Sequence, residues 1–286
     1  MIKALAAAAS IGLAGLSGVA ALAQAERPAT APAADAAMTT AVNGDWRTPE
    51  QRARDRWRHP VESLSFWGLR PGSTIVEIEP GGAWWTQILA PYAAATGGRY
   101  IGVLPSSGTP ETAERAAAAR QRFASTLSAP RYGQVAVVSL TPAGIDAPAG
   151  SADVVLVARA FHNWARVEGR TDAYMRAFFT VLKPGGVLAV EQHRLPAGQA
   201  ARPESGYVSE QYVIEAAQRA GFVLEARSEI NANPADTTVH PFGVWTLPPV
   251  RQSAPDNQPD NAAFDHTPYD RIGESDRMTL RFRKPR

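Results

Sequence analysis

Residues 75–91 read IVEIEPGGAWWTQILAP. A run rich in β-branched residues ends at Glu79, and Pro80-Gly81-Gly82 follows before two tryptophans that open a helical pattern. Glycine tolerates left-handed backbone and lets a ligand approach the main chain closely. Strand, glycine turn and helix in this order predict a ligand-binding edge, because α/β sheets bind ligands beyond the carboxyl ends of their strands.

The rest of the chain repeats this alternation of strand and helix patterns. We predict strands at 74–79, 99–103, 134–139, 153–158, 186–191, 222–229 and 278–284. We predict helices at 83–91, 110–127, 171–182 and 209–220. This alternation indicates right-handed crossovers and a parallel sheet. The segment 231–277 carries seven prolines and little periodicity, which is typical of a functional lid or a disordered insert.

The N-terminus has the pattern of a targeting segment. Lys3 precedes an apolar run that ends in small residues, so we predict a cleaved export signal over 1–25 and a periplasmic or secreted protein without a stable membrane span. Residues 26–44 are mostly Ala, Pro and Thr and predict a flexible leader. We expect a single domain over 45–286, with a helical cap at 45–70 and the Pro-rich insert near its end.

Composition and missing motifs exclude several functions. A formal net charge of +2 gives no basic field for nucleic acid, and the absence of cysteine excludes disulfides and thiolate chemistry. Glu191, His193 and His240 lack a metal-binding spacing, so no metal is expected. The dinucleotide fingerprint and the nucleophile elbow of α/β-hydrolases are both absent. The oligomeric state is not indicated.

The acid Glu77 and the turn Glu79-Pro80-Gly81-Gly82-Ala83, with LKPGGVL at 182–188, resemble the class I S-adenosylmethionine-dependent methyltransferases. Further segments are similar to a bacterial group of exported predicted methyltransferases: 54–72, 77–92, FHNW at 161–164, 229–237 and 272–278. The resemblance implies a Rossmann-like, seven-stranded, mostly parallel sheet. Helices would cover both faces, and the last strand would be antiparallel.

The resemblance also implies a cofactor, S-adenosylmethionine, and a small or medium acceptor that the sequence does not identify. The residues implied to hold the cofactor are Glu77, Glu79, Gly81, Gly82, Ala83 and Trp84. His162 is expected to act as a general base and Asn163 to orient the acceptor. Two purely structural interpretations stay open. His162 and Asn163 could form hydrogen bonds with loop backbone groups, and Trp84 could be a core residue.

The chain also departs from the family pattern. Glu79 and Ala83 replace two glycines, and the second strand ends Val103-Leu104-Pro105 without the acid that binds the ribose in the family. The missing acid favours an alternative, an exported non-catalytic ligand-binding module on a methyltransferase scaffold, whereas the retained glycine turn and FHNW favour the enzyme. The arginine run 52–58 is either a collar for an anionic substrate or a solvated helix face.

Overall fold

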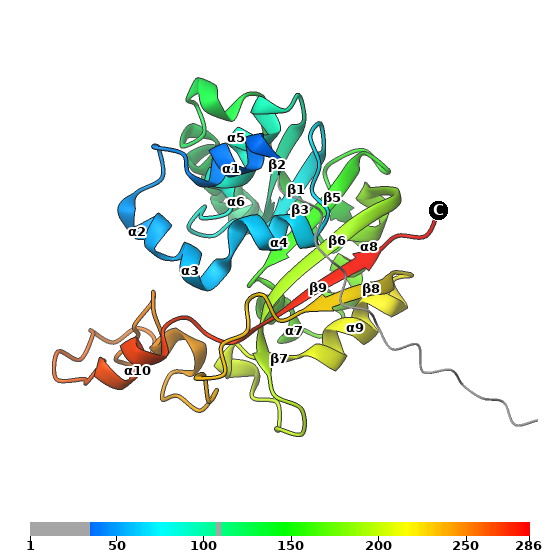
Figure 1. Cartoon of the computed structure of the whole chain (residues 1–286). Coiled ribbons are helices and arrows are strands. Elements are labelled where there is room, and N and C mark those ends of the chain that lie inside the picture. Colours follow the sequence, from blue (N-terminus) through cyan, green and yellow to red (C-terminus); the bar gives the residue numbers. More distant parts are fainter. Residues whose placement is uncertain (1–34, 107–109) are drawn as a thin grey trace, which may run out of the picture.

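The computed structural model describes residues 35–106 and 110–286, so the predicted signal over 1–25 lies outside the described residues. A central sheet with strand order β4-β3-β2-β1-β5-β6-β9-β8 lies between two layers of helices (Figure 1). The strands are β1 Thr74–Ile78, β2 Arg99–Pro105, β3 Val135–Thr141, β4 Gly144–Ile145, β5 Ala152–Ala158, β6 Leu182–Leu195, β7 Val208–Ser209, β8 Val223–Ser228 and β9 Arg277–Arg283.

Strand directions agree with the predicted sheet. Strands β3, β2, β1, β5 and β6 pair in parallel, whereas β9 runs antiparallel to both β6 and β8. The seven longer strands therefore confirm the predicted Rossmann-like sheet with an antiparallel last strand. Two short strands were not predicted: β4 extends the sheet beside β3, and β7 pairs with the end of β6.

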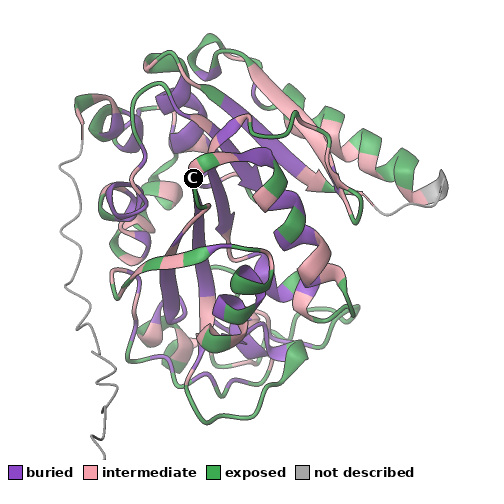
Figure 2. Ribbon diagram, turned by 90° about the vertical axis from the view of Figure 1, so that its right-hand side faces the viewer, coloured by how far each residue is buried: buried purple, intermediate pink, exposed green. Residues whose placement is uncertain are grey.

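Helices cover both faces of the sheet, as predicted. The helices are α1 Ala36–Val42, α2 Pro49–Ala53, α3 Asp55–Arg58, α4 Pro60–Phe66, α5 Thr86–Ala95, α6 Pro110–Ser125, α7 Phe161–Ala165, α8 Arg170–Val181, α9 Glu210–Arg219 and α10 Thr267–Ile272. Helices α1, α4 and α5 pack on one face, and α7, α8 and α9 on the other. Burial is deepest in the strands between these layers (Figure 2).

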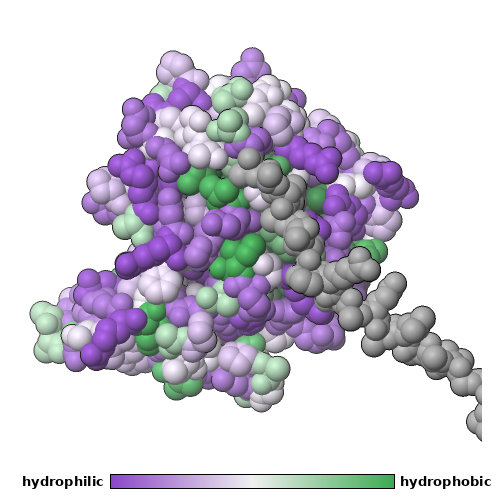
Figure 3. Space-filling model, in the orientation of Figure 1, coloured by the Kyte–Doolittle hydropathy of each residue, from purple (hydrophilic) through white to green (hydrophobic). Residues whose placement is uncertain are grey.

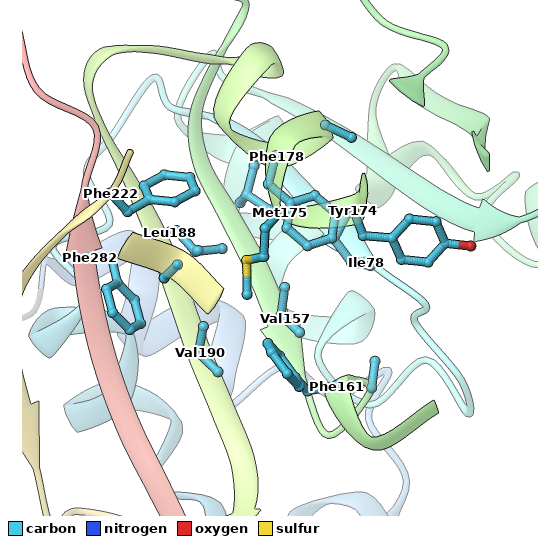
Figure 4. Packing of buried hydrophobic residues seen from close by; sticks show 14 of the residues in the cluster. Ile78, Val157, Phe161, Tyr174, Met175, Phe178, Leu188, Val190, Phe222 and Phe282 are labelled. Atoms are coloured by element: carbon cyan, nitrogen blue, oxygen red, sulfur yellow. The ribbon is translucent and has the colours of Figure 1, made fainter. Parts of the chain in front are cut away.

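The core follows from the two-residue alternation of the strands. In β1, Ile75 faces the layer of α1, α4 and α5, whereas Val76 and Ile78 face α8 and α9. Figure 4 shows the second cluster, in which Met175 and Phe178 of α8 pack over the aliphatic side chains of the sheet. Continuous apolar strands are expected where both faces of a parallel sheet are covered.

The flexible leader predicted over 26–44 is wrong for its final residues, which form α1. Asp35 caps this helix by accepting a hydrogen bond from the Met38 backbone N–H at 2.8 Å. Its other carboxylate oxygen accepts from the hydroxyl of Tyr92 on α5 at 2.7 Å. Met38, Ala41 and Val42 are buried, so tertiary packing orders a segment whose composition predicted flexibility.

The Pro-rich insert 231–277 is ordered around buried polar groups. Asp236 accepts hydrogen bonds from the Tyr207 hydroxyl, the ring of His240 and the backbone N–H of Thr238 and Asp276. These partners replace the regular backbone ladder that the segment mostly lacks. Over residues 35–106 and 110–286, none of the helices combines the length and apolar character needed for a membrane span.

Candidate active site

A cavity of about 690 Å³ lies at the carboxyl ends of the parallel strands. Its walls come from the ends of β1, β2, β5 and β6, from the N-terminal helices and from the insert. Figure 3 shows the surface hollowed between the region of α2 and α3 and the lobe of the insert, with a mostly hydrophilic margin. This size lies within the range of small-molecule sites, roughly 300–1,000 Å³.

The glycine turn forms one wall of this cavity. The backbone takes positive φ at Glu79 (48°), Gly81 (56°) and Ala83 (60°). Positive φ is strained for residues other than glycine and clusters at functional sites. A Cβ on Gly82 would meet no atom within 4 Å, and one on Gly81 would meet only a backbone oxygen at 3.8 Å. The bare main chain therefore faces open space.

The carboxylate of Glu79 does not fill that space. It accepts hydrogen bonds from Asn163 Nδ2 at 2.9 Å and Trp164 Nε1 at 2.7 Å, both on α7. Burial raises the pKa of the Glu79 carboxyl above its ordinary value, although these two hydrogen bonds and the charge of Arg170 oppose the rise. Glu79 thus ties the end of β1 to the segment FHNW and lines the cavity.

Glu77 lies beneath the turn and does not line the cavity. Its Oε2 accepts from Tyr100 Oη at 2.6 Å and from Thr86 Oγ1 at 2.8 Å. Burial raises the pKa of Glu77 from 4.5 to about 7, against the opposing effects of these hydrogen bonds and of the charge of Arg159. In this structure Glu77 joins β1, β2 and the first turn of α5.

Trp84 is both a core residue and a wall residue. It is buried, and its indole N–H donates to the backbone oxygen of Gln51 at 2.8 Å. The guanidinium groups of Arg58 and Arg47 lie 4.7 and 5.1 Å from the ring centroid, a cation–π geometry. The indole is therefore held against the N-terminal helices and leaves the cavity open.

Two histidines, His162 of α7 and His193 near the end of β6, line the cavity with ring centroids 5.5 Å apart. Gln192 Nε2 lies 3.2 Å from His162 Nδ1 and also donates to the Gly206 oxygen. An amide nitrogen only donates, so His162 Nδ1 accepts and the proton of the neutral ring resides on Nε2. This arrangement makes His162 a hydrogen-bond donor toward the cavity and disfavours its expected role as a base.

His193 Nδ1 lies 2.6 Å from Ser275 Oγ, which reaches it from the segment before β9. Burial lowers the pKa of His193 well below its ordinary value, and the charges of His162, Arg159 and Arg277 add to this effect. Burial likewise lowers the pKa of His162 to about 4. Both rings are therefore uncharged at neutral pH, so each has one nitrogen without a proton. In His162 that nitrogen already accepts from Gln192.

Arginines and two glutamates form a network of ion pairs at another wall of the cavity. Glu274 binds Arg54 and Arg58 of the N-terminal helices at 2.6 and 2.9 Å. Arg277 joins Glu274 to Glu191, at 3.0 and 2.8 Å. Arg159, which follows β5 with a φ of 56°, also binds Glu191, at 3.1 Å. Ion pairing thus joins the N-terminal helices to the ends of β5, β6 and the insert.

The structure gathers six of the eight predicted site residues around the cavity: Glu79, Gly81, Gly82, Trp84, His162 and Asn163. Glu77 and Ala83 do not line it. At the end of β2 the lining groups are Leu104 and Pro105, so the cavity has an apolar surface at the strand end where the resemblance led us to expect an acid. Within the described residues, no group of three or more histidines and acids is placed to hold a metal ion.

Sequence reasoning missed or undervalued other lining residues: Arg54, Arg58, Arg159, His193, Trp245, Glu274 and Ser275. The identity of His193 as a polar residue at a strand end was a usable signal. Arg159 occupies the equivalent position after β5, but no motif marks it. Trp245, Glu274 and Ser275 belong to the insert, whose sequence has no periodic pattern from which its position could be predicted.

Comparison with known proteins agrees with this fold. Residues 77–190 match the family model described as "Methyltransferase domain", whereas no curated protein matches the sequence. The cyclase SpnF is 15% identical, with a TM-score of 0.51 and coverage of 85% of each chain. A complex containing the Haloferax volcanii Trm112 methyltransferase activator gives 15% identity, a TM-score of 0.50, and coverage of 88% of this chain and 99% of that chain.

A SAM-dependent methyltransferase from Aquifex aeolicus is 18% identical over 68% of this chain and 93% of that chain, with a TM-score of 0.45. At such identities structural similarity concerns the fold alone. The chain has a mixed α/β, Rossmann-like methyltransferase fold. The matched domain lies in the central part of that fold and supports S-adenosylmethionine as the cofactor.

Proposed function

We propose that this protein transfers a methyl group from S-adenosylmethionine to a small acceptor in an exported compartment, as the resemblance to exported methyltransferases implies. The observation that carries the proposal is the cavity, where the bare backbone of Gly81 and Gly82 faces uncharged histidines. The cofactor, when bound, supplies a methyl group on a cationic sulfur. The turn fits such a group because no side chain occupies the space in front of it.

His193 is the base in this proposal. When Nδ1–H donates to Ser275 Oγ, Nε2 is free to accept the proton that an acceptor oxygen or nitrogen loses. Ser275 can accept from Nδ1–H in this tautomer and holds the ring in place, so it acts as a positioning residue. His162 donates from Nε2 to the acceptor, and Asn163 is held by Glu79 at the margin of the cavity. Positioning of donor and acceptor provides the larger part of the rate.

A thermal-shift titration of the mature chain with S-adenosylmethionine and S-adenosylhomocysteine tests the proposal. Ligand at a hundred times its dissociation constant should add about 2.7 kcal/mol to the free energy of unfolding. Gly81→Val should abolish the shift. Gly97→Val is the matched control, because Gly97 also has positive φ (73°) and open space around it but lies outside the cavity lining. Equal shifts in both variants would remove the turn from the site.

One observation favours a second candidate function, a non-catalytic binding module. Leu104 and Pro105 offer no carboxylate to a ribose, and a hydrogen bond to a charged group contributes about 1.5–3 kcal/mol. The fold is also not tied to one chemistry, since a similar structure is that of a cyclase. Absence of any shift at millimolar S-adenosylmethionine and S-adenosylhomocysteine would favour this candidate.

A further inference from the structure

Positive charge is in excess on the wall of the cavity that the ion-paired arginines form. Four guanidinium groups and two carboxylates make up this arginine wall: Arg54, Arg58, Arg159, Arg277, Glu191 and Glu274. The excess is two positive charges at neutral pH. Glu79, the other carboxylate that lines the cavity besides Glu274, is bound by neutral donors on α7 and pairs with none of these arginines. With Glu79 ionised, the excess over all these groups is one positive charge.

The two carboxylates of the wall are fully engaged, whereas the arginines keep free donors. Glu274 Oε1 accepts from Arg54, and its Oε2 accepts from Arg58 and Arg277. Each guanidinium has five N–H donors. The Arg58 side chain is 2% exposed, and its Nη1 finds no hydrogen-bond partner among the described residues. A buried donor without a partner is unfavourable unless a ligand satisfies it.

Like charges reinforce this excess. The pKa of Arg54 is lowered by burial and further by the charges of Arg159 and Arg277, although Glu274 opposes the shift. The Arg54 and Arg159 side chains are 25% and 20% exposed, and both line the cavity. An anion entering the cavity would therefore meet partly exposed guanidinium groups that repel each other in its absence.

We infer that the arginine wall binds an anionic group, a carboxylate or a phosphate, and that the methyl acceptor is an anionic small molecule. The acceptor assignment rests on the proposed function. S-adenosylmethionine carries a sulfonium, an ammonium and a carboxylate, so its binding adds one net positive charge to a cavity already positive at this wall. An anionic acceptor offsets part of this positive charge, and guanidinium groups bind carboxylate and phosphate in a matching planar geometry.

Calorimetric titration of the full chain with benzoate, benzamide and inorganic phosphate tests this inference, with and without saturating S-adenosylhomocysteine. Benzoate should bind at least about tenfold more tightly than its neutral isostere benzamide, also when S-adenosylhomocysteine is present. Arg54→Gln and Arg159→Gln should each weaken benzoate binding about tenfold or more. The matched control is Arg56→Gln, because Arg56 belongs to the same arginine run but is exposed and does not line the cavity.

Each alternative outcome has a distinct meaning. Displacement of benzoate by S-adenosylhomocysteine would assign the arginine wall to the carboxylate of the donor and overturn the anionic acceptor. Equal affinity of benzoate and benzamide, equal effects of Arg54→Gln and Arg56→Gln, or failure of both benzoate and phosphate to bind would overturn the anion site. Arginine-dependent benzoate binding without S-adenosylhomocysteine binding would instead refute methyl transfer and retain the anion site.

Discussion

Replacing Glu77 with glutamine separates the structural role of this buried acid from a cofactor role. In the folded protein the pKa of Glu77 is raised from 4.5 to about 7, with burial as the main cause. The folded state therefore holds this proton more tightly than the unfolded state does. The resulting stabilisation is fully present below pH 4.5 and is lost as the pH rises through 7.

The size of the effect follows from the shift of the pKa. Since one pKa unit corresponds to about 1.4 kcal/mol, the rise from 4.5 to about 7 amounts to about 3 kcal/mol across this pH range. Urea unfolding of the wild type and of Glu77→Gln should be measured between pH 4.5 and 7.5. The stability of the variant relative to the wild type should increase by about 3 kcal/mol over this range.

A relative stability that stays constant with pH would refute the burial argument for Glu77. The same variant also tests the geometry of the site, because the Glu77 carboxylate faces Tyr100 and Thr86 and does not line the cavity. Its affinity for S-adenosylhomocysteine should stay within about threefold of the wild type, a change of under 1 kcal/mol. Loss of binding in a folded Glu77→Gln protein would restore the direct cofactor role that the resemblance implies.

The remaining predictions concern stability and proton affinity. The lowered pKa of His162 stabilises the folded state above pH 6.5, and this stabilisation is lost as the pH falls through about 4. His162→Gln should therefore reduce the fall in the free energy of unfolding between pH 6.5 and 4. Urea unfolding that falls with pH as steeply in the variant as in the wild type would contradict this. Phe178→Ala should cost about 3–5 kcal/mol in urea unfolding, because the side chain is fully buried; a cost below about 1 kcal/mol would place it outside the rigid core. Gly273→Ala should lower the melting temperature much more than Gly150→Ala. Both glycines have positive φ, but only a Cβ on Gly273 would meet the Trp57 side chain, at 2.2 Å.

The sheet could be predicted because its signals are local. Each long strand is an apolar or alternating run, and Gly81 and Gly82 mark the turn after the first. The pattern at 83–91 predicted a helix, although α5 begins three residues later, at Thr86, because Ala83 takes a positive φ that a helix cannot accommodate. Local patterns thus predicted the presence of elements better than their boundaries.

The parts of the site that escaped prediction depend on contacts between distant residues. His193 and Ser275 are 82 positions apart, and Arg54 and Glu274 are 220 apart. Neither partner of these pairs carries a motif by itself. The Arg run at 52–58 was ambiguous because only tertiary packing decides that Arg54 and Arg58 line the cavity while Arg52 and Arg56 are exposed.

The ion pairs of Glu274 with Arg54 and Arg58 have a consequence for biogenesis. The two sides of these pairs are separated by 220 and 216 positions, so they meet only when nearly all of the described chain has left the ribosome. A nascent chain that ends before residue 270 has the strands β1 to β8 but cannot complete the arginine wall. The arginine wall is therefore completed together with β9, the strand that joins β8 to the sheet, at the end of synthesis.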